Sequence, residues 1–287
     1  MDTKELLKKV RKIELKTKGL STQIFSGEYH SAFKGRGMAF SEVREYTPGD
    51  EIRTIDWNVT ARFNHPYVKV FHEERELTVM LIIDISGSTV FGSKTQLKRD
   101  LIAELAAVIS FSAMQNNDKV GLLLFADQPE LFIPPKKGKK HVLRIIRELL
   151  EFKPETQGTN IGAALSYFNN VIKKRSIAFL ISDFIGSDFQ DELRISSRKH
   201  DLVALQLEDP AESDLPKIGW TQLQDLETGK SKWVNTNSSR VRKGVKARAI
   251  ERNRKLKEGF RRAGVDFARL QTNRPYVQPL MNLFKGR

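Results

Sequence analysis

The sequence is organised around one stretch, Leu77-Thr-Val-Met-Leu-Ile-Ile-Asp-Ile-Ser-Gly-Ser88. Its first seven residues are an almost unbroken run of apolar side chains, with Thr78 as the exception. Such a run is typical of a strand that is buried on both faces, as in the middle of a parallel sheet. Gly87 then permits a sharp turn of the backbone. The stretch therefore predicts an interior strand that ends in a tight loop.

The loop after this strand carries three oxygen-bearing side chains at alternate positions. Asp84, Ser86 and Ser88 supply one carboxylate and two hydroxyl groups, which a tight turn would aim at one point. An oxygen-only ligand set suits Mg²⁺ or Mn²⁺ and does not suit zinc. The alternative is a capped turn, in which Asp and Ser side chains bond to the local backbone. This segment alone leaves the two interpretations balanced.

Length and composition favour one large domain, or one domain with an extension. The chain has 287 residues, 39% of them hydrophobic, and no cysteine, so it has no disulfide, thiolate nucleophile or Cys-ligated zinc. A reducing compartment fits this composition. The N-terminal segment lacks the apolar core of a secretory signal, and no window reaches the roughly 18 apolar residues of a membrane-spanning helix. We therefore expect a soluble, cytoplasmic protein.

The chain is strongly basic, and the charge is unevenly placed. The formal net charge is +14, which suits nucleic acid, an anionic membrane surface or an acidic protein as partner. Residues 240–262 hold eleven basic and two acidic side chains. Apolar residues recur there on one helical face, which predicts an amphipathic helix with a basic outer side. A solvated helix face packed on a sheet is the simpler explanation of this charge.

Apolar runs of strand length alternate with helical patterns along the rest of the chain. This alternation predicts an α/β fold: a doubly wound, mostly parallel sheet with helices on both faces. Alternating runs around Thr228-Gly predict a small β-hairpin insertion at about 212–236, and two prolines after residue 133 predict a short edge strand. The other predicted strands are 67–72, 119–125, 176–181, 202–207 and 265–270, and the predicted helices are 2–18, 94–115, 140–152, 161–165, 191–198, 240–262 and 275–284.

Two more oxygen-bearing side chains fall where such a sheet places its ligands. In doubly wound folds, ligands bind beyond the carboxyl ends of the strands. Asp183 follows the strand at 176–181, and Thr159 lies in the loop before the helix that starts at residue 161. Together with Asp84, Ser86 and Ser88 they make five candidate ligands for a hard cation. The pattern of a generic sheet does not by itself show that the five converge.

A charged segment precedes the central strand. Thr47-Pro-Gly-Asp50 is a turn signal, and acidic and basic residues surround it among Tyr46 and Trp57. This mixture predicts half-buried charge pairs beside aromatic side chains, in a structural network that ties an N-terminal region, residues 1–75, to a main domain, residues 76–287. A glycosidase-like carboxylate pair is the alternative, but no apolar pocket in the sequence supports it.

Three motifs together resemble the metal-ion-dependent adhesion site of von Willebrand factor A domains. They are Asp84-x-Ser86-x-Ser88, Thr159 within Gly-Thr-Asn-Ile-Gly-Ala-Ala-Leu, and Asp183 within Ile-Ser-Asp. The resemblance covers about residue 77 to the C-terminus, apart from the hairpin. It implies a von Willebrand factor A-like fold in which the three hydroxyl groups ligate Mg²⁺ (or Mn²⁺) directly and the two aspartates act mostly through water. An open position would accept an acidic side chain of a partner protein.

Phe184 departs from that resemblance, because many such domains have glycine at this position. A phenylalanine there is expected to narrow the rim of the site and to alter which ligand fits.

The N-terminal region contains Gly37-Met-Ala-Phe-Ser-Glu-Val-Arg-Glu-Tyr-Thr-Pro-Gly-Asp-Glu-Ile-Arg-Thr-Ile-Asp-Trp-Asn58 followed by Ala61-Arg62, and the tail contains Gly264-Val-Asp-Phe…Pro275-Tyr. Both resemble the signature of the DUF fifty-eight family. Members of that family are bacterial or archaeal and are often encoded beside MoxR-type AAA+ ATPases. The resemblance therefore implies an ATPase partner in protein assembly or maturation, and a client that carries acidic residues. The signature residues, which we expect to be structural or interdomain, are Glu42, Arg44, Tyr46, Gly49, Asp50, Arg53, Asp56, Trp57 and Arg62.

Two other functions compete with a Mg²⁺-dependent protein-interaction module. The basic helix 240–262 suggests nucleic-acid binding, although no reader motif is present and no aromatic residues interleave with the charges. A metal-assisted hydrolase is the second alternative, but Ser86 stands where a phosphoryl-accepting motif would have a second aspartate. The five histidines are scattered, so no nucleophile, base and orienting group are visible together. We therefore expect a non-enzymatic protein with no catalytic residues.

Overall fold

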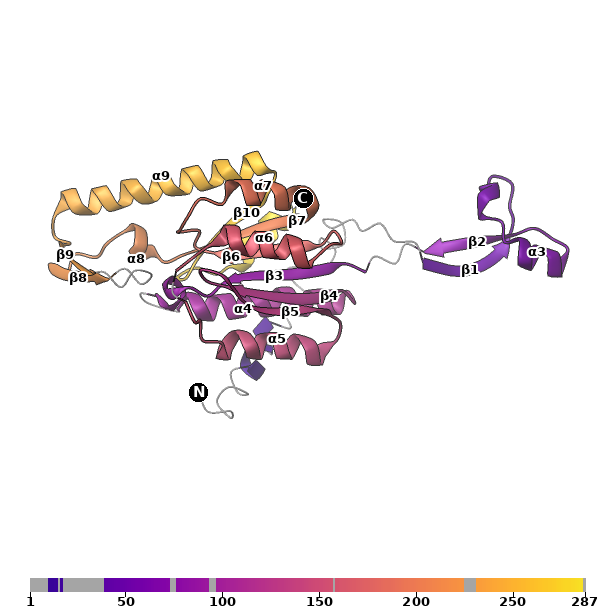
Figure 1. Cartoon of the computed structure of the whole chain (residues 1–287), viewed down its shortest axis with the longest axis horizontal. Helices are drawn as coiled ribbons and strands as arrows, with labels where there is room; N and C mark the ends of the chain where they lie inside the picture. The colour runs from indigo at the N-terminus through magenta and orange to yellow at the C-terminus, as the bar shows by residue number, and fades with distance from the viewer. Residues whose placement is uncertain are drawn as a thin grey trace. The chain divides into compact units, whose positions relative to one another are not determined.

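The chain divides into two compact units, which are described separately below. One unit is Phe33–Leu77, and the other combines Met1–Ala32 with Thr78–Arg287. The structure is a computed structural model (Figure 1), and it describes residues 10–14, 16–17, 39–72, 76–92, 97–156, 158–224 and 231–285. Residues 10–14 and 16–17 are helical, and the rest of the helix predicted at 2–18 lies outside the described residues.

A six-stranded sheet forms the centre of the larger unit, in the order β10-β7-β6-β3-β4-β5. All neighbouring strands are parallel except β4 and β5. This arrangement confirms the predicted doubly wound, mostly parallel sheet. The strands are β3 (Thr78–Asp84), β4 (Lys119–Phe125), β5 (Pro129–Lys136), β6 (Ile177–Ser182), β7 (Asp201–Glu208) and β10 (Asp266–Gln271).

The edge strand β5 is longer than the sequence predicts. Pro134 and Pro135 lie inside it, whereas the prediction ended the strand at Ile133. A proline has no backbone N–H to give to a ladder, so an edge strand accepts it where the missing donor would face away from the neighbouring strand. The pairing of β5 with β4 continues past both prolines, since Lys136 is opposite Val120.

Helices cover both faces of the sheet (Figure 1). Met80, Ile82 and Leu180 contribute to a hydrophobic cluster with the inner sides of α6, α7 and α9. Phe179 points to the opposite face, where its ring lies 6.3 Å from that of Phe284 in α10. The helices are α4 (Lys98–Gln115), α5 (Lys139–Glu151), α6 (Ile161–Val171), α7 (Gln190–Lys199), α9 (Ser239–Ala263) and α10 (Val277–Lys285).

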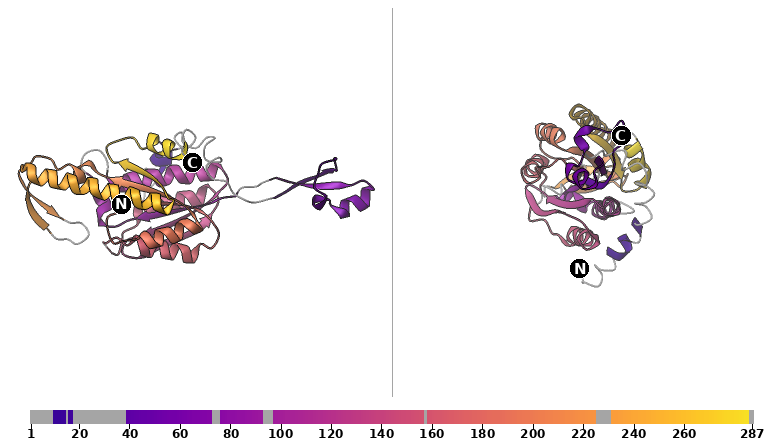
Figure 2. Two further views of the ribbon diagram at one scale, coloured as in Figure 1. Left: turned by 90° about the horizontal axis from the view of Figure 1, so that it is seen from above. Right: turned by 90° about the vertical axis from the view of Figure 1, so that its right-hand side faces the viewer.

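An insertion between β7 and α9 departs most from the sequence-based expectation. The predicted hairpin is present as β8 (Trp220–Gln224) and β9 (Ser231–Asn235), although its turn lies outside the described residues. The short helix α8 (Pro210–Ser213) was not predicted. Its capping box, formed by Asp209 and Glu212, and its first-turn proline are nevertheless readable start signals. Figure 2 shows α9 running beyond the sheet toward β8 and β9.

The smaller unit is built on a two-stranded antiparallel sheet of β1 (Ala39–Glu45) and β2 (Tyr67–His72). Between the strands lie a 3-10 turn, η1 (Ile52–Thr54), and helix α3 (Trp57–Phe63). The charge pairs predicted here are present as Arg44–Asp50 and Lys69–Asp56, whereas the Trp57 side chain is 67% exposed. It is the first residue of α3, and the short helix has no buried residue among its seven.

Charged signature residues stabilise this unit through local contacts. Arg44 pairs with Asp50 at 2.7 Å, across the turn that follows β1, and Gly49 supplies the φ of +115° that the turn needs. The carboxylate of Asp56 caps α3 by accepting hydrogen bonds from the Asn58 and Val59 amides. The Arg44 guanidinium and the Thr47 amide hold the pKa of Asp50 well below its usual range.

We predict that His200 makes the stability of the larger unit depend on pH. Its buried ring lies 4.4 Å from the ring of Phe168 and 3.1 Å from the Ser176 hydroxyl. Burial, together with the charges of Lys199 and Arg175, lowers the pKa of His200 from 6.5 to about 4. Between pH 6.5 and about pH 4 the unfolded chain therefore binds a proton that the folded protein does not bind.

The free energy of unfolding should accordingly fall between pH 6.5 and pH 4, by up to about 1.4 kcal/mol per pH unit from this group. The variant His200→Asn has no group that titrates here and should show a shallower fall. Urea unfolding across this pH range measures both slopes. Equal slopes for the two proteins would contradict the prediction.

Candidate functional site

The carboxyl ends of β3 and β6 bring buried acidic side chains together. Asp84 is the last residue of β3, and Asp183 follows the last residue of the neighbouring strand β6. Asp84 is fully buried, and its two carboxylate oxygens accept hydrogen bonds from the Ser86 amide at 2.9 Å and the Ser182 hydroxyl at 2.6 Å. Parallel pairing thus holds Asp84 beside the strand end that carries Asp183.

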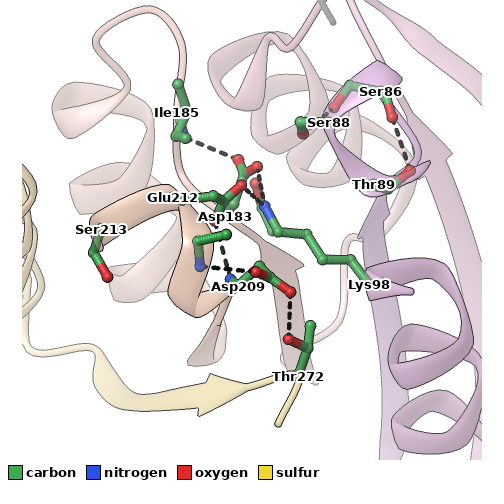
Figure 3. Close-up of polar contacts among 12 residues, drawn as sticks. Ser86, Ser88, Thr89, Lys98, Asp183, Ile185, Asp209, Glu212, Ser213 and Thr272 are labelled. Carbon is green, nitrogen blue, oxygen red and sulfur yellow. Dashed lines mark hydrogen bonds and ion pairs between the residues drawn. The ribbon is translucent and has the colours of Figure 1, made fainter. Parts of the chain in front are cut away.

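The turn after β3 presents two hydroxyl groups at this edge. Ser86 precedes the 3-10 turn η2 (Gly87–Val90), and its Oγ lies 3.1 Å from the Oγ of Ser88. The Thr89 hydroxyl donates to the Ser86 carbonyl at 2.8 Å and fixes the turn (Figure 3). The tight turn predicted from alternate Asp84, Ser86 and Ser88 is therefore present. Its local hydrogen bonds are also those of the capped turn that the sequence left open as the alternative.

Thr159 reaches the same edge from another element. The Asn160 amide donates to the Ala126 carbonyl just beyond β4, and the Asn160 side chain caps α6. On the other side, a Cβ on Gly186 would lie 2.9 Å from the Thr159 carbonyl oxygen, and Gly186 has a φ of +149°. Only glycine therefore fits this contact comfortably. The contact places the Thr159 loop against the turn that follows Asp183.

A buried lysine completes the edge, and no pattern in the sequence indicated it. Lys98, the first residue of α4, is 1% exposed. Its Nζ donates to Asp183 at 3.0 Å and to Glu212 of α8 at 2.5 Å (Figure 3). The other Glu212 oxygen accepts from the Asp209 amide, and Asp209 accepts from the Thr272 hydroxyl at 2.7 Å. One ammonium group thus links α4, the end of β6 and the α8 insertion.

The charges at this edge shift one another's pKa values. Burial raises the pKa of Asp84 above its usual range, and the nearby charge of Asp183 adds to this rise. Burial opposes the charged form of Lys98, but the charges of Asp183 and Glu212 outweigh it and raise its pKa. Burial also raises the pKa of Glu212, although Lys98 works against that rise. At this edge, the carboxyl groups of Asp84, Asp183 and Glu212 therefore outnumber the buried ammonium group of Lys98.

Phe184, which the sequence predicted to narrow the rim of the site, packs its side chain into the hydrophobic core. Its backbone adopts a left-handed φ of 57°, which costs a non-glycine residue about 1–2 kcal/mol. The side chain is 4% exposed, and its ring packs edge-on at 5.0 Å against Phe260. Aromatic packing in the core therefore offsets the backbone strain.

The predicted site residues divide between the two units. Asp84, Ser86, Ser88, Thr159 and Asp183 all lie at the carboxyl edge of the larger unit's sheet. The described residues hold no cluster of three or more His, Cys, Asp or Glu side chains that suits a metal ion. A cation at this edge would therefore depend on hydroxyl ligands beside the two aspartates. The signature residues Glu42, Arg44, Tyr46, Gly49, Asp50, Arg53, Asp56, Trp57 and Arg62 lie in the smaller unit.

A family model described as "Protein of unknown function DUF58" matches residues 42–255, which span both units. The chain belongs to the DUF58 family. It is the same family, DUF fifty-eight, that the sequence motifs resemble. The uncharacterized protein Rv1480 of Mycobacterium tuberculosis is 28% identical to this DUF58 chain over 290 residues, which cover 100% of this chain and 91% of that one.

A solved structure shares the fold of this DUF58 protein, and a second one aligns with it less closely. An aerotolerance-related membrane protein from Bacteroides fragilis aligns with a TM-score of 0.50 at 18% identity, over 74% of this chain and 100% of that one. The protein BatB from Bacteroides thetaiotaomicron aligns with a TM-score of 0.48 at 15% identity, over 73% of this chain and 98% of that one. In the described part of the DUF58 chain, no helix combines the length and the apolar character needed to cross a membrane.

We predict that Lys98→Met strongly destabilises the larger unit. The substitution leaves Asp183 and Glu212 without their shared ammonium, and breaking a buried ion pair in this way costs about 3–5 kcal/mol. Lys16→Met is the matched control, because its 2.7 Å pair with Glu104 is half exposed on the lysine side and should cost less than about 1 kcal/mol. Urea unfolding measures both losses.

The double variant Lys98→Met/Glu212→Gln tests the cause, since it removes one of the orphaned carboxylates and should recover part of the loss. A loss for Lys98→Met no larger than that for Lys16→Met would show that the buried network contributes little.

Proposed function

We propose that this DUF58 protein is a non-enzymatic, Mg²⁺-dependent protein-interaction module with a von Willebrand factor A-like cation site. The observation that carries the proposal is the gathering of Asp84, Asp183, two serine hydroxyls and the Thr159 loop at one sheet edge. Every donor in this set is an oxygen, and hard divalent cations prefer oxygen ligands. The surplus of buried carboxyl groups at the edge also favours a bound cation.

The residues suggest how a cation would be held. Ser86, Ser88 and Thr159 would ligate it directly, and Asp84 and Asp183 would act through water, as in the adhesion sites that the sequence resembles. Mg²⁺ suits such a site because it loses its water reluctantly and keeps several water ligands. When bound, the ion would supply an electrophilic position for a carboxylate of a partner protein. The Ser86 amide and the Ser182 hydroxyl fix the orientation of the Asp84 carboxylate.

The positions of the histidines support an interaction role over hydrolysis. His141 contacts the carbonyl of Val120, near the start of β4, and His200 lies just before β7. Both therefore lie near the amino ends of the strands, opposite the candidate site. His65 belongs to the smaller unit. Among the described histidines of the larger unit, none adjoins the carboxyl edge as a general base.

A MoxR-type AAA+ ATPase is the partner that we propose, with an acidic client as the protein on which the two act together. The genomic association typical of the family supports this partner, and the proposed open position at the cation explains why a client would need a carboxylate. Assembly or maturation of the client is the corresponding process. The proposed place of action is the cytoplasm.

We predict saturable Mg²⁺ and Mn²⁺ binding that depends on the two serines. Replacing both hydroxyl ligands in Ser86→Ala/Ser88→Ala should weaken binding by at least about tenfold. The control Ser110→Ala/Ser112→Ala removes two buried hydroxyls of α4 that lack hydrogen-bond partners among the described residues. Isothermal titration of the three proteins measures the affinities. Equal affinity in both double variants would show that Ser86 and Ser88 are not ligands of the cation.

We also predict that the protein captures, in a pull-down, a MoxR-type ATPase encoded in the same genome, and that this capture requires Mg²⁺. EDTA and Asp84→Asn should each reduce capture, because both act on the same cation site. Titrating Mn²⁺ with the partner present tests whether a partner carboxylate completes the site. Capture that is unchanged by EDTA and by Asp84→Asn would contradict a metal-dependent interaction.

A further inference from the structure

A groove begins at the rim of the candidate site and continues along α9. Its volume is about 1060 Å³, and it lies between the turn after β6, the start of α7 and one side of α9. Phe184 and Gly186 line its beginning, and they follow Asp183 by one and three positions. Gly186 packs against the carbonyl of Thr159. The groove and the candidate cation site therefore share the turn that carries Asp183.

One stripe of α9 brings positive charge into this groove. Arg248, Arg252, Lys255 and Arg262 line it, at spacings of four, three and seven residues that return to the same helix face. Three of the four are exposed, and Arg252 is half-buried. From Arg248 to Arg262 the helix axis rises about 21 Å. The groove thus offers a row of cations rather than one isolated charge.

The acidic residues of the groove are largely neutralised within the protein. Asp191 pairs with Arg194 at 2.8 Å. Glu251 and Glu258 both pair with Arg254, at 2.8 and 3.0 Å, and Arg254 points away from the groove lining. Asp188 accepts a hydrogen bond from the Gln190 amide, and Lys255 lies 3.9 Å from Glu251. The other three cations of the stripe have no acidic partner among the described residues.

Three arginines of the stripe have spare donors. Arg248, Arg252 and Arg262 make no ion pair or side-chain hydrogen bond with any residue that the structure describes. The Nε of Arg252 is shielded from solvent and has no acceptor within that described part. A buried donor without a partner destabilises the protein, and a ligand that supplied an acceptor would recover this energy. Guanidinium groups are suited to bidentate binding of carboxylates.

We propose that the groove binds an extended acidic segment of the partner protein, beside the carboxylate that the cation would take. The location of that first carboxylate rests on the proposed function, whereas the rest of the segment is inferred from the groove alone. About six residues of extended chain span the distance from Arg248 to Arg262. Phe184, Phe189 and Leu256 add apolar lining, so apolar residues between the carboxylates would fit as well.

The groove suits a peptide better than a nucleic acid. Glu251 and Glu258 line it beside the basic stripe, and they would repel the unbroken negative charge of a phosphate backbone. A peptide can place carboxylates opposite the arginines and leave uncharged residues opposite the two glutamates. The basic side of α9 would then select ligands whose carboxylates are spaced to meet the arginines.

Binding of a fluorescein-labelled peptide in which glutamate alternates with serine, followed by anisotropy, tests the inference on the full chain. Arg252→Gln/Arg262→Gln removes two cations of the groove and should weaken binding by about tenfold. Arg240→Gln/Lys246→Gln removes the same charge from the same helix outside the groove lining, and should weaken binding by less than about twofold. If Arg252→Gln impairs folding, the single variant Arg262→Gln, at an exposed position, replaces the double variant.

The outcomes separate the groove from the metal site. Loss in the groove variant with no effect of EDTA supports the groove and counts against the metal proposal. Loss with EDTA but not in the groove variant overturns the groove and supports the metal site. Equal losses in both double variants, or no peptide binding at all, also overturn the groove. Tighter binding of a labelled oligothymidylate that weakens in the groove variant would assign the stripe to nucleic acid instead.

Discussion

The carboxyl edge of the sheet depends on how buried negative charge is balanced. Asp84 and Asp183 meet because two parallel strands end side by side, and parallel pairing leaves no freedom to separate them. Lys98 offsets part of this charge from α4, and Glu212 shares its ammonium group. A buried charge without a partner costs several kcal/mol, so these groups fix one another's positions. The oxygen-rich edge is therefore a consequence of a constraint on the fold as well as a candidate binding site.

The α8 insertion takes part in this balance and connects it to more distant elements. Glu212 reaches Lys98 because the capping box at Asp209 holds the short helix in place. Asp209 is in turn fixed by the Thr272 hydroxyl, just beyond β10. Helix α9 follows the hairpin that α8 leads into, and its inner residues Leu256 and Phe260 pack into the core. A ligand at the edge or in the groove would thus contact elements that share one core.

Helix α9 shows how one segment serves both the core and the surface. Ala249, Leu256 and Phe260 are buried, which satisfies the packing requirement of the sheet face. The remaining faces carry the basic residues that give the chain much of its positive charge. Ion pairs of Arg254 with Glu251 and Glu258 neutralise the acidic residues locally. Within the basic helix, Arg254 is therefore paired, whereas Arg248, Arg252 and Arg262 face the groove without an ion pair to any described residue.

The sequence by itself determined the main strands and helices of the larger unit, their doubly wound fold and the oxygen-bearing residues at the strand ends, whereas β1, α3 and α8 were not predicted. These features follow from local rules, since the apolar runs of β3, β4 and β6 mark buried strands and Gly87 marks the turn between Asp84 and Ser88. The capping box of α8 was equally local, but a four-residue helix has too little periodicity to be noticed. Only the tertiary structure decided that Lys98 is buried against Asp183 and Glu212, which lie 85 and 114 residues away along the chain. Only the tertiary structure likewise set Gly186 against Thr159 and the arginines of α9 beside the same turn. Such contacts depend on strand register and helix packing, and neither is encoded in the spacing of residues along one segment.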